Sequence, residues 1–295
     1  MWESIVQIPS EENVQSAIQM RRMPFEYTDD IEPHWRPDQP EWSHMVNGAS
    51  LTMPFLEPFL NVNMNEALPN ISDPQILADA VAFIGQESQH YRQHRKYNSL
   101  LKRKGYPELV DVEGAMDASF KRLAGKSLAF RLAYTAGFET LTLGATEWVV
   151  TNRMEMFKNS DLRIASLLLW HLVEETEHKT VAFDVYQDIC GSYWQRIYGL
   201  LYASYHMVFW TRQGYIAMLK KDGLWRDLKS RRRLWRRSLA ATAAFGKHIL
   251  HGLMPTHDPR QINDPKWVID WMARYEAGGS GVPLLNQQTL SNIEI

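Results

Sequence analysis

Two of the long segments with helical periodicity contain the same short pattern, in which a glutamate is followed three residues later by a histidine. One is Glu87-Ser-Gln-His90 and the other is Glu175-Thr-Glu-His178. Each lies in a long segment with helical periodicity, and residues three apart on a helix are neighbours on one face. Each pattern therefore offers a carboxylate and an imidazole side by side, which is half of a metal site. The two halves constrain the fold, because they can share a metal centre only if their helices pack together.

Helix start and stop signals divide the middle of the chain. Pro74 stands in a first turn, and the basic run Lys102-Arg103-Lys104 followed by Gly105 ends the same segment. Pro54 and Pro58 must kink or divide another segment, because proline removes a backbone donor. We expect four long helices, over 42–68, 73–104, 127–158 and 161–189.

The flanking segments complete the expected organisation. They are an N-terminal arm (1–40) with one short helix over 11–23, a bundle (41–192), a helical extension packing on the bundle (193–278) and a flexible tail (279–295). The segment near 113–124 has no clear pattern, and little of the chain alternates as a strand would. The sequence therefore predicts an all-α fold, a four-helix bundle with a helical C-terminal extension.

Two further glutamates stand in apolar surroundings on the other two expected bundle helices. Glu57 is flanked by Phe-Leu and Pro-Phe-Leu, and Glu139 by Ala-Gly-Phe and Thr-Leu-Thr-Leu. A carboxylate buried in such a run costs several kcal/mol, of order 5, unless a partner compensates it. Two divalent cations would compensate four carboxylates. Glu147, two turns along the same helix, is an alternative to Glu139.

Two more histidines fall on the faces of the Glu-x-x-His motifs. His171 lies one turn before Glu175, and His94 lies one turn after His90. Either histidine is an additional ligand or a hydrogen-bonding residue that orients a ligand. A hydrogen-bonded core histidine is the alternative for His171, and a solvated residue is the alternative for His94.

The order Glu, Glu-x-x-His, Glu, His-x-x-x-Glu-x-x-His resembles the ferritin-like di-iron N-oxygenases that act on p-aminobenzoate. The run from His171 to Asp184 also resembles a bacterial family labelled predicted metal-dependent hydrolase. The resemblance covers roughly 40–190 and implies a ferritin-like bundle with a di-metal site in its core, in which His171 is a seventh protein ligand. The implied ligands, which also form the catalytic site, are Glu57, Glu87, His90, Glu139, His171, Glu175 and His178.

Carboxylates and imidazoles without a thiolate favour iron or manganese over structural zinc. We expect two Fe ions, with Mn or a mixed Fe/Mn pair as alternatives, and O2 as co-substrate. The favoured function is a di-iron oxygenase or oxidase acting on a small apolar or acyl substrate. The alternatives are a metal-dependent hydrolase using a metal-bridging hydroxide on the same ligands, and a non-catalytic iron-binding bundle. No Gly-rich nucleotide fingerprint is present, so electrons are expected from a separate donor protein.

Charge and composition limit the remaining partners. The net charge of the 295 residues is −2, which gives no bulk attraction to nucleic acid, and Cys190 is the single cysteine. The first residues lack a basic start and an apolar run, so we expect a cytoplasmic protein. The basic, Trp-flanked segment 225–237 is either a solvated helix face or a peripheral contact with an anionic membrane surface. A homodimer is compatible with the sequence.

Overall fold

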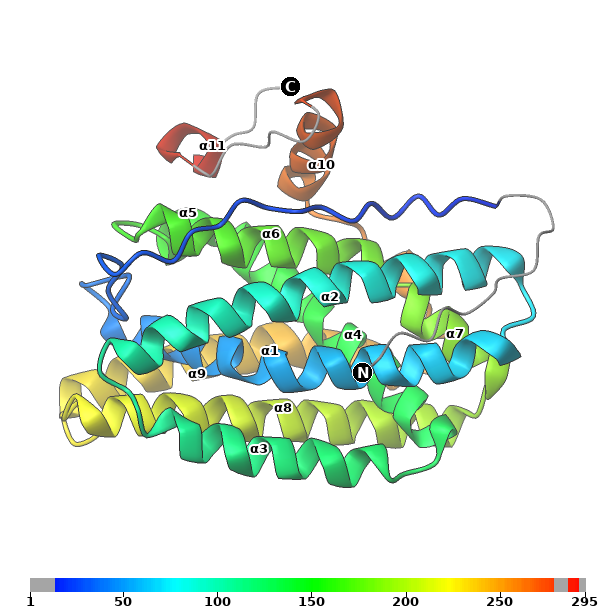
Figure 1. Ribbon diagram of the computed structural model, residues 1–295, viewed down its shortest axis with the longest axis horizontal. Coiled ribbons are helices and arrows are strands. Elements are labelled where there is room, and N and C mark those ends of the chain that lie inside the picture. Colours follow the sequence, from blue (N-terminus) through cyan, green and yellow to red (C-terminus); the bar gives the residue numbers. More distant parts are fainter. Residues whose placement is uncertain (1–13, 279–285, 292–295) are drawn as a thin grey trace.

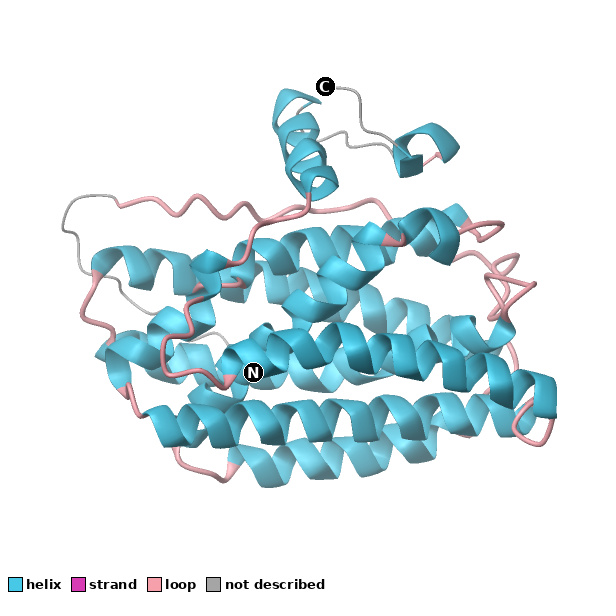
Figure 2. Cartoon of the chain, turned by 180° about the vertical axis from the view of Figure 1, so that it is seen from behind, coloured by secondary structure: helices cyan, strands magenta, loops and turns pink. Residues whose placement is uncertain are grey.

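The computed structural model describes residues 14–278 and 286–291, and among these it contains helices and no strand (Figures 1 and 2). The helices are α1 (Pro40–Ala67), α2 (Pro74–Arg103), α3 (Leu109–Ala124), α4 (Leu128–Thr151), α5 (Arg153–Met156), α6 (Leu162–His178), α7 (Val181–Ile189), α8 (Tyr193–Lys221), α9 (Leu228–Gly252), α10 (Lys266–Gly278) and α11 (Gln287–Ser291). The predicted all-α fold is confirmed.

Side-chain caps explain where three of the bundle helices begin. Asp73 accepts hydrogen bonds from the first-turn backbone N–H groups of α2, Ser127 does the same for α4, and Asp161 for α6. Such caps satisfy donors that have no partner within the helix. Helices α1, α2, α4 and α6 surround a common core; α1, α2 and α6 run close to the long axis of the molecule in Figure 1, and α4 crosses behind them obliquely.

Helix α1 is not divided at its prolines, contrary to one of the expected alternatives. A proline at position 54 leaves the carbonyl oxygen of Ser50 without its helical donor. The amide of Asn98 on α2 donates to that oxygen at 2.9 Å and replaces the missing bond. Helix α1 therefore runs continuously from Pro40 to Ala67, and Glu57 lies in its buried half.

The third and fourth expected helices end earlier than the sequence suggested. Helix α4 ends at Thr151, and the short helix α5 follows it. Helix α6 ends at His178, and after a two-residue turn α7 continues to Ile189. Lys179 in that turn donates to the carbonyl oxygen of Ile262 and to Asp264, so the break is held by a distant segment.

Helices α8 and α9 pack against the bundle and form part of its interior wall. Helix α8 lies along α4 and α1, and α9 lies along α4. The backbones of α4 and α8 touch at a glycine: a Cβ on Gly137 would lie 2.5 Å from the Cα of Leu200. Gly199 is the reciprocal case, because a Cβ there would lie 2.4 Å from the carbonyl of Ala133.

The N-terminal segment 14–39 is largely extended and passes along α2 and α6 before entering α1 (Figure 1). The short helix expected over 11–23 is therefore not formed at 14–23, and 1–13 lies outside the described residues. Of the predicted flexible tail, 279–285 and 292–295 also lie outside them, while α11 lies between. Across the described ranges, no helix is both long and apolar enough to cross a membrane.

Candidate metal centre

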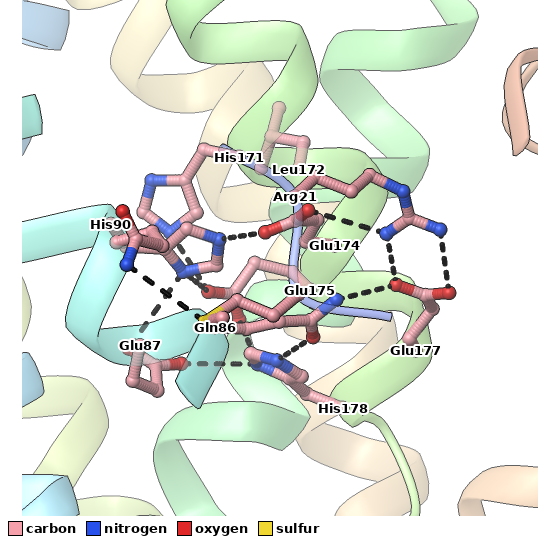
Figure 3. Close-up of polar contacts among 12 residues, drawn as sticks. Arg21, Gln86, Glu87, His90, His171, Leu172, Glu174, Glu175, Glu177 and His178 are labelled. Atoms are coloured by element: carbon pink, nitrogen blue, oxygen red, sulfur yellow. Dashed lines mark hydrogen bonds and ion pairs between the residues drawn. The ribbon is translucent and has the colours of Figure 1, made fainter. Parts of the chain in front are cut away.

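The structure brings the seven predicted ligands together in the interior of the bundle. None of them is more than 7% exposed. They come from α1 (Glu57), α2 (Glu87 and His90), α4 (Glu139) and α6 (His171, Glu175 and His178). Figure 3 shows the α2 and α6 side chains turned toward one another between the two helices.

The ligating atoms form overlapping groups in which all atoms lie within 4.8 Å of one another. The groups are Glu57 with Glu87 and His90; Glu57 with His94 and His171; His90 with His171 and Glu175; and Glu87 with Glu139, Glu175 and His178. Five residues each belong to two of these groups, so the groups form one continuous cluster: Glu57, Glu87, His90, His171 and Glu175. The four carboxylates thus lie in one cluster with the imidazoles, as in helical bundles that hold a pair of cations between their helices.

Most polar atoms of this cluster have no hydrogen-bond partner. Both carboxylate oxygens of Glu57, Glu87 and Glu139 are buried and make no hydrogen bond, although Oε1 of Glu87 lies 3.0 Å from Nδ1 of His178. One oxygen of Glu175 and the Nδ1 atoms of His90 and His178 are likewise buried and make no hydrogen bond. Buried polar atoms are nearly always satisfied, and an orphan group indicates an ion or another missing partner. These atoms account for more than half of the orphan side-chain atoms found in the described residues.

The pKa values of Glu57 and Glu139 indicate that the cluster holds too little positive charge for all of its carboxylates. Burial, followed by the neighbouring carboxylates Glu87 and Glu175, raises the pKa values of Glu57 and Glu139 well above the ordinary range. Burial by itself would raise the pKa of Glu87. The contacts with the imidazoles of His178 and His90 lower it by more, so the pKa of Glu87 lies below its ordinary value. Four carboxylates therefore cannot all ionise here without cations. Two divalent cations would balance their charge.

His90 and His178 are held by residues that directly precede the motif glutamates. Nε2 of His90 lies 2.9 Å from an oxygen of Glu174, and Nε2 of His178 lies 2.6 Å from the amide oxygen of Gln86. Because both partners accept, each Nε2 carries a proton, and the Nδ1 atom of each ring in its neutral form would present a lone pair to the cluster. A hydrogen-bond partner behind a metal-ligating histidine is typical of metal sites.

Arg21 from the N-terminal segment joins these two arrangements (Figure 3). Its guanidinium lies 3.2 Å from Glu174 and 2.6 Å from Glu177. Glu177 in turn accepts from the side-chain amide of Gln86 at 2.8 Å, which fixes the orientation of that amide. Arg21 is 1% exposed. One buried cation thus orients the partners of both motif histidines.

His171 is oriented by a chain of hydrogen bonds that begins at Asn98. The Asn98 amide donates to the Ser50 carbonyl, so its oxygen accepts from the Ser50 hydroxyl at 2.8 Å. The hydroxyl must then accept from Nδ1 of His94, and Nε2 of His94 accepts from Nδ1 of His171 at 2.7 Å. Burial lowers the pKa values of both histidines, which keeps them neutral.

The unprotonated Nε2 of His171 therefore points into the cluster. It lies 2.8 Å from an oxygen of Glu175 and 3.7 Å from an oxygen of Glu57. A lone pair facing carboxylates at these distances is repulsive unless a cation lies between them. Of the alternatives for His94, the orienting one agrees with this geometry, because His94 is 2% exposed and hydrogen-bonded on both sides.

Glu147 is not part of the centre, so the alternative that placed it there is wrong. Its side chain is 46% exposed and pairs with Lys247 and His248 of α9. Glu139, two turns earlier on α4, faces the bundle interior instead. The sequence analysis missed Arg21, Gln86 and Glu174. A signal was present for the last two, because each motif glutamate follows a residue with an acceptor oxygen in its side chain.

An apolar cavity of about 320 Å³ leads to one side of the cluster. Side chains of α1, α4, α6, α8 and α9 line it, and His94, His171 and Glu175 lie at its inner end. Its other lining residues are mostly Met, Val, Leu, Ala and aromatic side chains, with a few hydroxyl groups. Val208 and Thr242 line it while being exposed, so the cavity reaches the surface between α8 and α9.

A family model described as predicted metal-dependent hydrolase matches residues 19–263. The chain belongs to the predicted metal-dependent hydrolase family. No curated protein and no solved structure matches it. The matched range contains all seven predicted ligands, together with Arg21 and both helices that wall the outer cavity. The buried His/Glu groups allow metal binding, as the family description implies.

Proposed function

We propose that the protein is a dinuclear non-haem iron oxygenase or oxidase that uses O2 to oxidise an apolar or acyl substrate, with a manganese or mixed Fe/Mn pair as the alternative cofactor. The observation that carries the proposal is the junction of two features. A cluster of four carboxylates and three imidazoles meets the inner end of an apolar cavity. Carboxylates and imidazoles without a thiolate suit iron or manganese.

The dinuclear centre would supply redox chemistry with O2, and the chain's residues would control where that chemistry occurs. Glu57, Glu87, Glu139 and Glu175 would hold the two ions through their carboxylates. His90, His171 and His178 present lone pairs whose direction is set by Glu174, His94 and Gln86. The bundle keeps water away from a reactive centre, and the cavity admits the substrate from the α8 and α9 side.

The cavity lining favours oxidation of an apolar group over hydrolysis. Its only acidic residue is Glu175, which belongs to the cluster, and it contains no lysine or arginine. A hydrolytic substrate carries a polar ester, amide or phosphate, and binding it requires placed polar groups, since unpaired polar groups are costly to bury. The cavity instead offers surfaces such as Met45, Phe138 and Leu168.

Hydrolysis on the same ligands is the second candidate, because the family description names it. Hydroxyl groups in the cavity lining, such as those of Thr211, Ser238 and Thr242, are features that could hold a polar substrate. A bundle that only stores iron is the third candidate. The large apolar cavity beside the cluster has no role in storage, so we place this candidate last.

Metal content and oxygen uptake separate the oxygenase from the hydrolase. The protein is stripped with a chelator, loaded anaerobically with Fe(II) and then exposed to O2 in an electrode cell. We expect two Fe per chain, O2 uptake and a transient visible absorption band. The zinc-loaded protein is assayed in parallel against acyl esters of graded chain length. Ester turnover without any O2 response of the iron form would contradict the oxygenase and support the hydrolase.

Two glutamates of the same helix provide a matched pair of variants. Glu139→Gln removes a carboxylate of the cluster, and we expect iron affinity at one position to fall by more than about 100-fold. Glu147→Gln removes a carboxylate two turns away that pairs with Lys247 and His248 on the surface. That control should load and respond as the unchanged protein does. Equal behaviour of the two variants would refute the assignment of Glu139.

The surface around the cavity mouth supports a peripheral membrane contact as the way in which the substrate arrives. Helix α8 exposes a stripe with helical spacing (Trp194, Tyr198, Leu201, Tyr205 and Val208), and α9 exposes Trp235 and Leu239. Val208 belongs to both the stripe and the cavity lining. Within the basic segment 225–237, Arg233 and Arg237 bind Glu41 and Glu155, while Arg232 and Arg236 are exposed.

Aromatic and basic side chains on one face suit the interface of an anionic bilayer. We expect the protein to cosediment with vesicles containing phosphatidylserine, and to do so less at high salt. Trp194→Ser combined with Trp235→Ser should reduce this binding. Val110→Ser, at an exposed apolar position of α3, is the control. Equal sedimentation of all three proteins would refute the membrane contact and leave the metal centre untouched.

A further inference from the structure

A second group of metal-ligating side chains lies at one end of the bundle, outside the centre described above. It consists of His34 from the N-terminal segment, His44 from α1, Tyr106 from the loop after α2, and Asp222 directly after α8. The ends of these segments lie together at one end of the molecule in Figure 1. His34, His44 and Asp222 form the combination of two histidines and one carboxylate that is common at zinc sites. The hydroxyl group of Tyr106 contacts all three.

Four atoms of this group form a small tetrahedron. Nε2 of His34 and Nε2 of His44 are 3.0 Å apart, and they lie 2.7 and 2.6 Å from one oxygen of Asp222. The hydroxyl oxygen of Tyr106 lies 3.0 Å from the same carboxylate oxygen and 3.4 Å from each Nε2. Around a zinc ion with bonds of roughly 2.0 to 2.1 Å, the corners of a regular tetrahedron are about 3.3 Å apart.

Hydrogen bonding among these side chains alone leaves a conflict. If both Nε2 atoms carry protons, both donate to one carboxylate oxygen and the two N–H groups face each other at 3.0 Å. If one of them is unprotonated, its lone pair faces that oxygen. A cation at the centre removes the conflict, because it accepts all of the lone pairs. His44 is fully buried, and burial lowers its pKa, so the neutral imidazole needed for ligation is the stable form.

The surroundings are acidic. The negative charge of Glu41 is felt by His44, and the negative charges of Glu32, Glu108 and Asp222 are felt by Tyr106. Two of these charges are offset, because Lys104 pairs with Glu32 at 2.7 Å and Arg233 pairs with Glu41. The site is partly open, since the side chain of His34 is 39% exposed and that of Asp222 is 17% exposed. An ion can therefore reach it without opening the bundle.

We propose that His34, His44 and Asp222, with Tyr106 at the fourth corner, bind a zinc-type divalent cation that fastens the N-terminal segment to the end of the bundle. The ion is structural, because protein atoms occupy all four corners of the tetrahedron. The segment it fastens also carries Arg21, which orients the partners of the motif histidines at the dinuclear centre. The site does not depend on the reaction of that centre, nor on the metals it holds.

Zinc stoichiometry tests the proposal in the full chain. Chelator-treated protein is titrated with Zn(II), and bound metal is counted after gel filtration. We expect the unchanged protein to bind one more zinc per chain than His34→Ala or Asp222→Asn. His251→Ala is the control, because His251 also faces another histidine, His257, at 2.9 Å but without a carboxylate. Equal counts for the unchanged protein, His34→Ala and Asp222→Asn would overturn the proposal and indicate a hydrogen-bonded cluster only.

A second measurement covers the case in which a variant fails to fold. Crystals of the unchanged protein soaked with zinc should show an anomalous peak between the two Nε2 atoms and Asp222. Absence of this peak, with peaks present at the dinuclear centre, would overturn the second site alone. Zinc should also raise the melting temperature of the unchanged protein more than that of His34→Ala. Equal shifts in the two proteins would count against the proposal.

Discussion

Replacing Arg21 by methionine tests whether one cation in the N-terminal segment organises the metal centre. Methionine approximates the length of the side chain but carries no charge. The change leaves Glu174 fully buried with no cation beside it, and Glu177 only 13% exposed. Breaking a buried ion pair from one side costs about 3–5 kcal/mol, because the remaining charge stays unpaired. The guanidinium also lies over the rings of Trp271 and Tyr275, which adds to the loss.

The same change should weaken metal binding, although Arg21 touches no ligand. Glu174 and Gln86 orient His90 and His178, and the positions of both partners depend on Arg21. Losing an orienting partner of a metal-bound histidine costs about 10- to 100-fold in affinity. That loss corresponds to roughly 1.4–2.7 kcal/mol.

Urea unfolding and a metal titration measure the two effects separately. Arg163→Met is the matched control. Arg163 pairs with Asp161 and Asp30, but its side chain is 35% exposed, so these pairs should contribute less than about 1 kcal/mol to the free energy of unfolding. Adding Glu174→Gln to Arg21→Met removes the unpaired charge and keeps an oxygen for His90, so part of the stability should return. If Arg21→Met and Arg163→Met are equally stable and bind metal equally well, the reasoning about Arg21 is refuted.

Three further predictions concern the centre and its cavity. In the folded apoprotein the pKa values of Glu57 and Glu139 are raised, so the fold favours their protonated forms. The resulting stabilisation is complete only below the pKa of a glutamate in the unfolded chain, about 4.3. In thermal melts of metal-free protein, the melting temperature should therefore fall as pH rises through the folded-state pKa values of these two glutamates. The metal-loaded protein should not show this fall. Parallel pH profiles of the two forms would contradict the prediction. His94→Phe removes the acceptor for Nδ1 of His171 and should lower metal affinity about 10- to 100-fold in a competition titration, and an unchanged affinity would make His94 a simple core residue. Ala145→Phe places a ring in the cavity and should leave two ions bound while blocking binding of long acyl probes, as followed by calorimetry; unchanged probe binding would show that this cavity is not the substrate site.

Local spacing is enough to predict the inner layer of the centre. Three-residue and four-residue separations put Glu87 with His90, and His171 with Glu175, on single helix faces. The apolar neighbours of Glu57 and Glu139 indicated buried carboxylates, and both are buried. The sequence did not show whether Glu139 or Glu147 belongs to the cluster, because residues two turns apart lie on nearly the same face of a helix. The contact of Glu147 with α9 decides it.

Long-range packing explains what the sequence did not reveal. Arg21 and Glu174 are 153 positions apart, and His34 and Asp222 are 188 apart, so no spacing rule connects them. The C-terminal helices were expected to pack on the bundle, but nothing in their periodicity shows that α8 and α9 wall the cavity. The continuity of α1 across Pro54 depends on an amide from α2, which is again a tertiary contact.

The partners of the motif histidines reveal the register of α2 and α6. Gln86 accepts from His178, and Glu174 accepts from His90. Moving from Gln86 to His90 along α2 therefore corresponds to moving back from His178 to Glu174 along α6, so the two helices run antiparallel. The two contacts are therefore related by an approximate twofold axis between antiparallel helices. A shift of α6 by one turn would separate both pairs at once and remove the histidine donor from the buried Glu174. The repeated pattern of an acceptor side chain, glutamate, two residues and histidine thus specifies helix pairing as well as ligation, because each copy supplies the partner that the other copy needs.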